Sequence, residues 1–293
     1  MSVIAVINRK GGSGKSTLAT HLAAYCGSTG AAVMIGDVDR QQSTQTWLRL
    51  RKAQSPGPAA EIVGWSIDPS SFARPPTGID HVILDTPGGL RGFDLARVVM
   101  YADAILMPVC NSIFDRESAA ECLAELRTLP RVAGGRCKVG AIGMRLDART
   151  RGAEVMQAWA AGLDLPFVAV LRESQAYVRC IENGLSLFDL PAAQVEADLE
   201  QWKPILHWLR PVLQPELKPA HENPGPSTTR TPATRTPVQH AGRPAAPTTP
   251  RPVTPVRPLA ARPVARPART AATSPVSRWL DALPIPRFLQ RTP

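Results

Sequence analysis

The sequence lacks the features of several protein classes. No run approaches the roughly 18 consecutive apolar residues that a membrane-spanning helix requires. No basic segment precedes the apolar stretch near the N-terminus and no cleavage-like site follows it, so we do not expect a signal peptide. The five cysteines are scattered without Cys-x-x-Cys spacing, which argues against a disulfide scaffold or a thiolate zinc site. These absences favour a cytoplasmic protein.

Acidic residues are scarce in the C-terminal part of the chain. The last 83 residues contain 12 Lys and Arg but only 3 acidic residues, together with 19 of the 30 prolines. Subtracting these from the totals of 34 basic and 24 acidic residues leaves 22 and 21 in residues 1–210. The net charge of +10 therefore belongs almost entirely to the tail. We expect one globular domain over residues 1–210, which is long enough to bury a core.

The tail divides into two parts by composition. Residues 211–274 repeat Arg-Pro, Thr-Pro and Ala-Pro pairs, and proline removes a backbone donor and fixes φ. Because few large apolar residues remain to offset the entropy of ordering, we predict a disordered basic, Pro-rich linker. Residues 275–293 instead form a short apolar and basic terminal motif, whose apolar members are Trp279, Leu280, Leu283, Ile285, Phe288 and Leu289.

Short apolar runs alternate with helix-like stretches in the first 210 residues. The expected strands are 3–7, 33–36, 82–84, 104–108, 139–144 and 167–171. The expected helices are 16–26, 93–101, 116–128, 151–161, 174–183 and 192–209. Strands that are apolar throughout, separated by helices, predict an α/β fold with a mainly parallel sheet and helices on both faces. Ligands bind at the carboxyl ends of the strands in such folds.

A glycine-rich segment follows the first expected strand, at residues 8–17 (Asn-Arg-Lys-Gly-Gly-Ser-Gly-Lys-Ser-Thr). Glycines allow backbone N–H groups to turn toward phosphates, and the N-terminus of the next helix adds a favourable dipole. Lys15 is expected to reach the β- and γ-phosphates, Ser16 to bind Mg²⁺ and Thr17 to support the α-phosphate. The segment therefore predicts a P-loop.

Residues 10–17 resemble the deviant Walker A motif of the ParA/MinD family of ATPases, which carries an extra lysine before the first glycine. The resemblance implies a three-layer P-loop NTPase with ATP and Mg²⁺ as ligands. It also implies an ATP-sandwich homodimer in which Lys10 neutralises charge on the partner's phosphates, as an arginine finger does. A side chain at Gly12 would obstruct such a dimer. The implied phosphate-binding residues are Lys10, Gly11, Gly12, Ser13, Gly14, Lys15, Ser16 and Thr17.

Two further segments resemble motifs of the same family in the same order. Residues 34–42 resemble its second-strand motif, and residues 82–89 resemble its Walker B segment. The resemblance implies that Asp39 positions or activates the attacking water, so that the catalytic residues are Lys10, Lys15 and Asp39. The implied metal-site residues are Ser16, Asp37 and Asp85. An aspartate after a strand is also a common helix cap, and this interpretation of Asp37 or Asp85 stays open.

The family resemblance implies a function in positioning. Relatives bind chromosomal DNA nonspecifically as ATP-dependent dimers on the nucleoid, and a cargo adaptor stimulates hydrolysis. The cargo would be a plasmid, a chromosome region or a protein assembly. Candidate DNA contacts lie in the basic tail or in the domain, and each domain arginine is equally well interpreted as a solvated surface residue. Those in the domain are Arg145, Arg149, Arg151, Arg172 and Arg179.

Two features near the site and the C-terminus leave alternatives open. The loop at residues 145–151 lies where relatives contact adenine, which is weaker support than a motif. The alternative function is a MinD-like ATPase that uses residues 275–293 to associate with a membrane. Because Pro284 and Pro286 interrupt any helix there after about two turns, we favour a partner-binding motif over a membrane anchor.

Overall fold

The computed structural model describes residues 1–39, 41–54, 61–66, 77–147 and 149–214. These residues all belong to the first of two compact units, Met1–Gly225. The predicted terminal motif and the linker from residue 215 onward lie outside the described residues. The division of the tail therefore stays a prediction.

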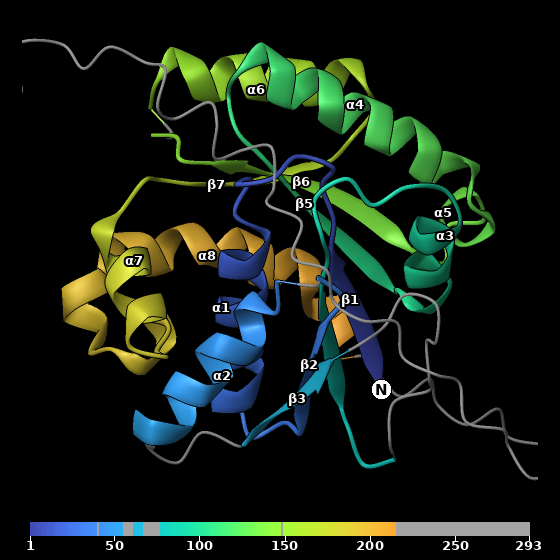
Figure 1. Ribbon diagram of the computed structural model, residues 1–293. Coiled ribbons are helices and arrows are strands. Elements are labelled where there is room, and N and C mark those ends of the chain that lie inside the picture. Colours follow the sequence, from blue (N-terminus) through green and yellow to red (C-terminus); the bar gives the residue numbers. More distant parts are fainter. Residues whose placement is uncertain (40, 55–60, 67–76, 148, 215–293) are drawn as a thin grey trace, which may run out of the picture. The chain divides into compact units, whose positions relative to one another are not determined.

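A seven-stranded sheet forms the centre of the domain, with the order β3-β2-β4-β1-β5-β6-β7 (Figure 1). Every pairing between neighbouring strands is parallel, which confirms the predicted sheet. The strands are β1 Ser2–Val6, β2 Val33–Asp37, β3 Ile62–Ser66, β4 His81–Asp85, β5 Ala104–Val109, β6 Lys138–Met144 and β7 Phe167–Leu171.

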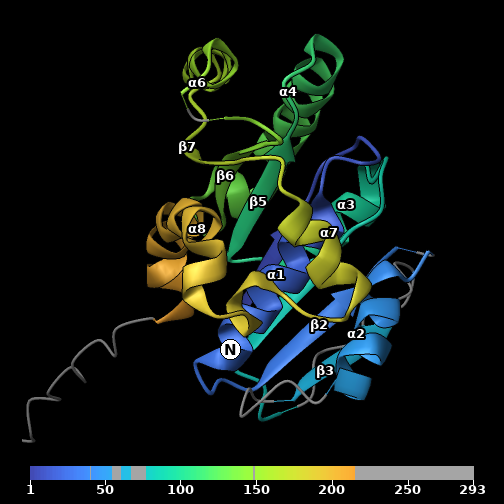
Figure 2. The same cartoon turned by 90° about the vertical axis from the view of Figure 1, so that its left-hand side faces the viewer.

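Helices cover both faces of the sheet (Figures 1 and 2). One face carries α1 Lys15–Ser28, α2 Ser43–Gln54, α7 Gln175–Glu182 and α8 Ala192–Leu213, with a 3-10 turn, η1, at Leu187–Asp189. The other face carries α3 Gly92–Tyr101, α4 Ile113–Thr128, α5 Pro130–Ala133 and α6 Arg151–Gly162.

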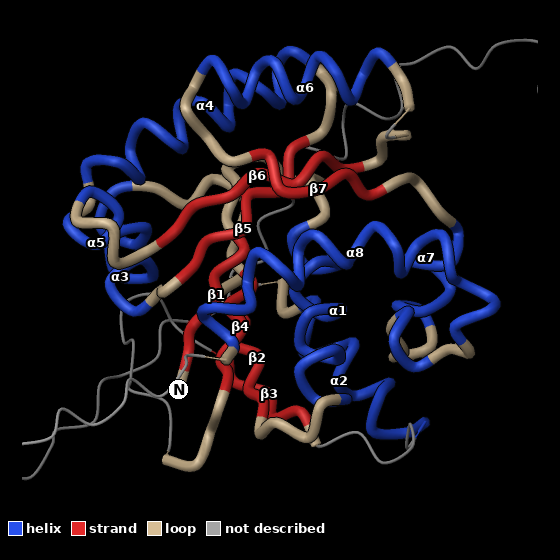
Figure 3. Tube along the Cα trace, turned by 180° about the vertical axis from the view of Figure 1, so that it is seen from behind, coloured by secondary structure: helices blue, strands red, loops and turns tan. Residues whose placement is uncertain are grey.

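Strand β1 shows why the central strands read as continuous apolar runs. All five of its residues are buried. Ile4 and Val6 pack toward α1, whereas Val3 and Ala5 pack toward α3 and α4. A strand buried on both faces needs apolar residues at successive positions, not at alternate ones. Figure 3 shows the strands, drawn in red, enclosed between the two helical layers. The three-layer α/β class predicted from the sequence is confirmed.

Besides the short α5 and η1, two elements, α2 and β3, are not among the expected helices and strands. The polar residues after β2 form helix α2, which buries only Thr44, Trp47 and Arg51, about one residue per turn. Strand β3 lies at the edge of the sheet and buries only Ile62. Each of these two elements contacts the core through only a few side chains. Their sequences therefore contain too few apolar residues to show the periodicity that marks a helix or a strand.

Helix α8 continues three residues past the predicted end of the domain at residue 210. It contains Pro204 and Pro211 and ends at Leu213. Trp202, Ile205 and Leu209 are fully buried in the core, so tertiary packing holds the helix despite its prolines. Within the described ranges, no helix is both long enough and apolar enough to cross a bilayer.

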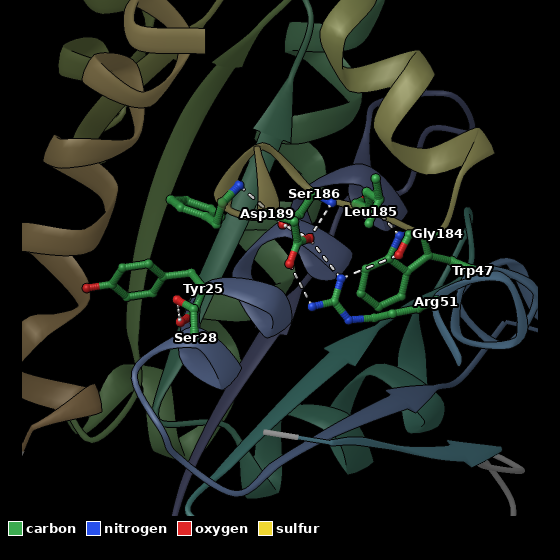
Figure 4. A network of polar contacts seen from close by, with 9 residues as sticks. Tyr25, Ser28, Trp47, Arg51, Gly184, Leu185, Ser186 and Asp189 are labelled. Carbon is green, nitrogen blue, oxygen red and sulfur yellow. Dashed lines mark hydrogen bonds and ion pairs between the residues drawn. The ribbon is translucent and has the colours of Figure 1, made fainter. Parts of the chain in front are cut away.

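A buried ion pair fastens α2 to the segment that follows α7 (Figure 4). The guanidinium of Arg51 donates to both carboxylate oxygens of Asp189, at 2.8 and 2.9 Å. Both side chains are less than one-tenth exposed. Trp47 adds a bond from its indole N–H to the carbonyl oxygen of Leu185 at 3.0 Å. Because α2 begins just after Asp37 and Asp39, this attachment fixes the helix that follows the predicted catalytic loop.

Candidate functional site

A cavity of about 660 Å³ lies at the carboxyl ends of the central strands. The loop between β1 and α1, together with the first turn of α1, supplies seven of the eight predicted phosphate-binding residues, Gly11 to Thr17. The loops after β2 and β4 supply further lining residues. The other lining residues are Arg9, Asp39, Gln41, Ser43, Thr86, Pro87, Gly88, Gly89 and Arg145. The structure thus brings segments from three sequence motifs to one cavity.

Side-chain bonds and close packing set the shape of the glycine-rich loop. The buried amide of Asn8 donates to the carbonyl oxygen of Pro108 at 2.6 Å and accepts from the backbone N–H of Lys10 at 3.1 Å. Gly14, just before α1, has φ +93°, and a Cβ there would lie 2.7 Å from the methyl carbon of Met144. The left-handed backbone favours glycine here, and a Cβ would in addition displace the flexible end of Met144.

Lys15 lies inside the cavity with its ammonium group beside the loop. It is 7% exposed, and its Nζ donates to the carbonyl oxygen of Lys10 at 2.9 Å. Burial lowers the pKa of Lys15, while the charges of Asp85 and Asp39 act in the opposite direction. A largely buried cation at the start of a helix suits an anionic group such as a phosphate.

Asp85 is fully buried at the end of β4. Neither of its carboxylate oxygens has a hydrogen-bond partner in the part of the chain that the structure describes. Burial raises the pKa of Asp85 to about 7, although the neighbouring Ser16 hydroxyl lowers it. A buried carboxylate without partners is costly, and a hydrated divalent cation beside Ser16 would supply what it lacks. The residues present therefore fit Mg²⁺.

Asp37 and Asp39 have different surroundings. The buried carboxylate of Asp37 accepts from Thr44 through its backbone N–H at 3.0 Å and its hydroxyl at 2.6 Å, and from the backbone N–H of Asp39 at 3.1 Å. Asp37 thus binds the first turn of α2, as the helix-cap interpretation expects. Asp39 lines the cavity, and its Oδ1 accepts from the backbone N–H of Gln41 at 3.0 Å. Any contribution of Asp37 to a metal site remains a prediction.

Lys10 points away from the cavity. Its Nζ lies 2.9 Å from a carboxylate oxygen of Asp115, in the first turn of α4. The same ammonium lies 6.0 Å from the ring centre of Phe114, which is 70% exposed. Among the described residues that line the cavity, Lys10 is missing. The two lysines of one loop therefore face different surroundings.

A second, smaller cavity of about 150 Å³ adjoins the first. The two share Gly14, Thr17 and Arg145, and the smaller one extends between β6 and α7. Arg145 has φ +56°, a backbone conformation that an arginine adopts rarely and that is common at functional sites. Arg145, one of the candidate DNA contacts, thus lines both cavities.

The other candidate DNA contacts differ in their exposure and in whether an acidic side chain already binds them. Arg172 forms an ion pair with the buried Asp198 at 2.7 Å. Arg149 is 94% exposed at its side chain and lies 3.8 Å from Asp147. Arg151 and Arg179 are also exposed. An arginine held by a buried acid is less available to a phosphate than one that faces solvent.

Sequence reasoning missed Arg9 as a site residue. Arg9 lines the cavity, and its guanidinium bonds to Glu121 and Glu125 on α4. Its position just before Lys10 was the available signal. Glu121 and Glu125 are 112 and 116 residues away from it in the sequence, and nothing in their spacing indicates an arginine partner. Gln41 and Ser43 also line the cavity, and Gln41 falls within the second-strand motif.

Comparison with known proteins agrees with this geometry. Residues 4–188 match the family described as the CobQ/CobB/MinD/ParA nucleotide binding domain. The chain belongs to this family. The match covers more than half of the chain and includes every segment that lines the two cavities. The predicted ParA/MinD membership is confirmed, and the domain is that of an ATP-binding ATPase.

Relatives of this ParA/MinD-type chain include two curated proteins. Maintenance of carboxysome distribution protein A of Gloeobacter kilaueensis is 30% identical over 201 residues, which cover 67% of this chain and 89% of that protein. Chromosome-partitioning ATPase Soj of Thermus thermophilus is 27% identical over 184 residues, which cover 53% of this chain and 74% of Soj. The aligned lengths of 201 and 184 residues are close to that of the family domain, residues 4–188.

Solved structures share the fold of this ParA/MinD-type domain. Apo McdA from Cyanothece has a TM-score of 0.54 at 19% identity and covers 70% of this chain and 99% of its own. A plasmid partition protein of Borrelia burgdorferi bound to AMPPNP has a TM-score of 0.52 at 17% identity, with coverage of 71% and 99%. At these identities the comparison supports the fold alone.

Proposed function

We propose that the chain is a Mg²⁺-dependent ATPase that dimerises around ATP, binds nucleoid DNA nonspecifically and positions a cellular cargo. The observation that carries this proposal is that the side chains of Lys10 and Lys15 point in different directions. Lys15 lies in its own cavity, whereas Lys10 points out of it toward Asp115. A lysine on the outer side of a P-loop can serve the phosphates of a second copy, where it neutralises developing charge. Dimerisation would then complete the active site.

The metal site would use Ser16 and Asp85. The Ser16 hydroxyl would be a metal ligand from the P-loop, and the oxygens of Asp85, which lack a partner among the described residues, can accept bonds from metal-bound water. When bound, Mg²⁺ supplies positive charge that stabilises the phosphate oxygens during transfer. Asp39, which also lines the cavity, can accept a hydrogen bond from the attacking water and so orient it. Asp37 acts on this site by fixing the loop that carries Asp39.

The smaller cavity would accept the base of the nucleotide. It begins at Gly14 and Thr17, beside the α-phosphate end of the P-loop, and continues along α7 to the apolar side chains of Val178 and Ile181. An aromatic base needs such an apolar slot with a few polar groups at its rim. Arg145, which lines both cavities, would lie between base and phosphates.

The names of the relatives support a cargo-positioning role. They include a carboxysome distribution protein and a chromosome-partitioning ATPase. A shared mechanism with different cargoes requires an adaptor, and we expect an adaptor protein to stimulate hydrolysis. DNA would be contacted by the exposed arginines of the domain, by the basic tail, or by both. The chain would then act in the cytoplasm on the nucleoid.

Substitution of the two lysines tests the proposal. Lys15→Ala removes the buried cation of the cavity, so we expect ATP affinity to fall at least a hundredfold. Lys10→Ala leaves the cavity lining intact, so we expect ATP affinity within about threefold of wild type but loss of the ATP-induced dimer and of turnover. Titration with labelled ATP and light scattering with an ATP analogue measure both effects. Equal loss of ATP affinity in the two variants would contradict the assigned roles.

A further inference from the structure

We infer that Glu125 is a positioning residue for ATP hydrolysis. Its carboxylate, on α4, bonds both to Arg9 of the P-loop and to the first backbone N–H of α3. It thereby holds the loop of residues 86–92, which follows Asp85, against the phosphate cavity. The inference rests on the ATPase function proposed above, and it adds a group that no sequence motif includes.

Arg9 joins the P-loop to α4. Its guanidinium donates to Glu125 and, at 3.3 Å, to Glu121. The side chain of Arg9 is 16% exposed and that of Glu125 is 24% exposed, whereas Glu121 is 73% exposed. Water screens the pair with Glu125 less than it screens the pair with Glu121. Glu125 is therefore the stronger of the two attachments.

The backbone of Arg9 also contacts the loop after β4. Its carbonyl oxygen accepts from the backbone N–H of Gly89. Gly88 lies so close that a Cβ there would be 3.2 Å from the backbone nitrogen of Gly11 and 3.4 Å from the carbonyl oxygen of Arg9. Residues 86–89 line the same cavity as the P-loop. Arg9 is thus held on one side by α4 and on the other by the loop that follows the metal-site aspartate.

Glu125 closes this arrangement at the start of α3. One carboxylate oxygen accepts from the backbone N–H of Gly92, and the other accepts from Arg9. A carboxylate at a helix N-terminus is also favoured by the helix dipole. Gly89 and Gly92, on either side of Leu90 and Arg91, are therefore fixed by bonds to Arg9 and Glu125 respectively. The loop has little freedom to move away from the cavity while both bonds persist.

Lys10 and Arg9 both contact α4, but only the contact of Arg9 would persist in a dimer. Both attach to α4, Lys10 through Asp115 and Arg9 through Glu125. If Lys10 acts on a second copy, it must leave Asp115, and that contact with α4 is lost. The contact through Arg9 then keeps the P-loop, α4 and the loop of residues 86–92 together. Glu125 should therefore affect the chemical step more than the binding of nucleotide.

The test compares two glutamates on the same helix in the full chain. Glu125→Ala removes both bonds, so we expect kcat to fall at least tenfold while the Kd for an ATP analogue changes less than threefold. Glu125→Gln keeps an acceptor for the N–H of Gly92, so its kcat should lie between those of Glu125→Ala and the wild type. Glu121→Gln, the matched control, should keep kcat within twofold. A kcat of Glu125→Ala equal to wild type would overturn the inference.

A double variant separates positioning from stability. Arg9→Met with Glu125→Met replaces the ion pair by apolar side chains, which usually restores much of the stability lost in either single variant. It cannot restore the bond to the N–H of Gly92. We expect the double variant to recover the thermal midpoint but not kcat. Recovery of both would assign the pair a structural role only, and absence of hydrolysis by the wild-type chain would reject the proposed function together with this inference.

Discussion

At the scale of single residues, the protonation of Asp85 links the metal site to stability. Burial raises the pKa of Asp85 from 3.8 to about 7. Folding therefore favours the protonated carboxyl, so its stabilising contribution is full below about pH 4 and is lost as the pH rises through about 7. At about 1.4 kcal/mol per unit of pKa, the loss is of the order of a few kcal/mol. We predict that Asp85→Asn, without metal or nucleotide, gains stability over wild type as the pH rises from 5 to 8.

The free energy of unfolding, measured by urea denaturation across this pH range, checks the Asp85 prediction. Titrating groups far from Asp85 act equally on both proteins, so the difference between the two curves reports Asp85 together with the neighbouring charges that it interacts with, chiefly Lys15. Addition of MgATP should stabilise the wild-type protein at pH 8 and should stabilise the variant much less, because the carboxylate that helps to hold the metal is gone. Parallel curves without ligand would mean that Asp85 does not titrate in this range.

Contiguous motifs made most of the candidate site predictable. Lys15, Ser16 and their glycines lie next to one another in the sequence, so local spacing alone indicates phosphate binding. The structure adds the distinction between Asp85, whose oxygens accept no hydrogen bond from the described residues, and Asp37, whose oxygens already accept three. It also adds Glu125. Such roles depend on which distant segments meet, and a local pattern does not contain that information.

At the scale of elements, a buried ion pair between Arg51 and Asp189 is the charged part of the attachment of α2, shown in Figure 4. Arg51→Met would leave Asp189 buried without its cation, so we predict a loss of about 3–5 kcal/mol in the free energy of unfolding. In Arg51→Met with Asp189→Asn, the neutral amide oxygen still accepts from the backbone N–H and hydroxyl of Ser186. The double variant should therefore recover a large part of that loss. Chemical denaturation of the three proteins measures both values.

An exposed arginine provides the control for this prediction. Arg149 is 94% exposed and lies 3.8 Å from Asp147, so water screens the pair. We expect Arg149→Met to leave the denaturation midpoint unchanged within error. If Arg51→Met were equally neutral, the pair with Asp189 would not hold α2 in place.

Some helices and strands could be predicted from the sequence, whereas others could not. Strand β7 has the predicted bounds, and the strands on either side of β1 differ by one or two residues. Strands β4 and β5 bury nearly all of their side chains, so continuous apolar runs mark them. Strand β7 lies at the other edge of the sheet and buries two of its five side chains, but all five of its residues are apolar. Edge strand β3 exposes Val63 by 42%, and its partner α2 contacts the core through three residues. Where burial is sparse, the pattern that defines an element is sparse as well.

At the scale of the whole molecule, the distribution of charge separates two tasks. Residues 1–210 are nearly neutral, and several of their arginines bind acidic side chains of the same domain. The nine excess positive charges lie in residues 211–293. Because nonspecific DNA binding depends on cations that meet phosphates, the tail is the stronger candidate for this interaction. Catalysis and DNA binding would then reside in different parts of the chain.

Truncation after Gln214, which retains all of α8, tests this separation. If about 8 tail arginines contact phosphates, the logarithm of the DNA association constant should fall with the logarithm of salt concentration with a slope near −7. The truncated protein should bind ATP as the full chain does but show a much shallower slope. An unchanged slope would assign DNA binding to exposed domain arginines such as Arg149, Arg151 and Arg179. If truncation abolished binding to anionic vesicles and left DNA binding unchanged, the MinD-like membrane alternative would be favoured. In that case a fluorescent fusion of the full chain would lie at the cell periphery, and a fusion of the truncated chain would leave the periphery.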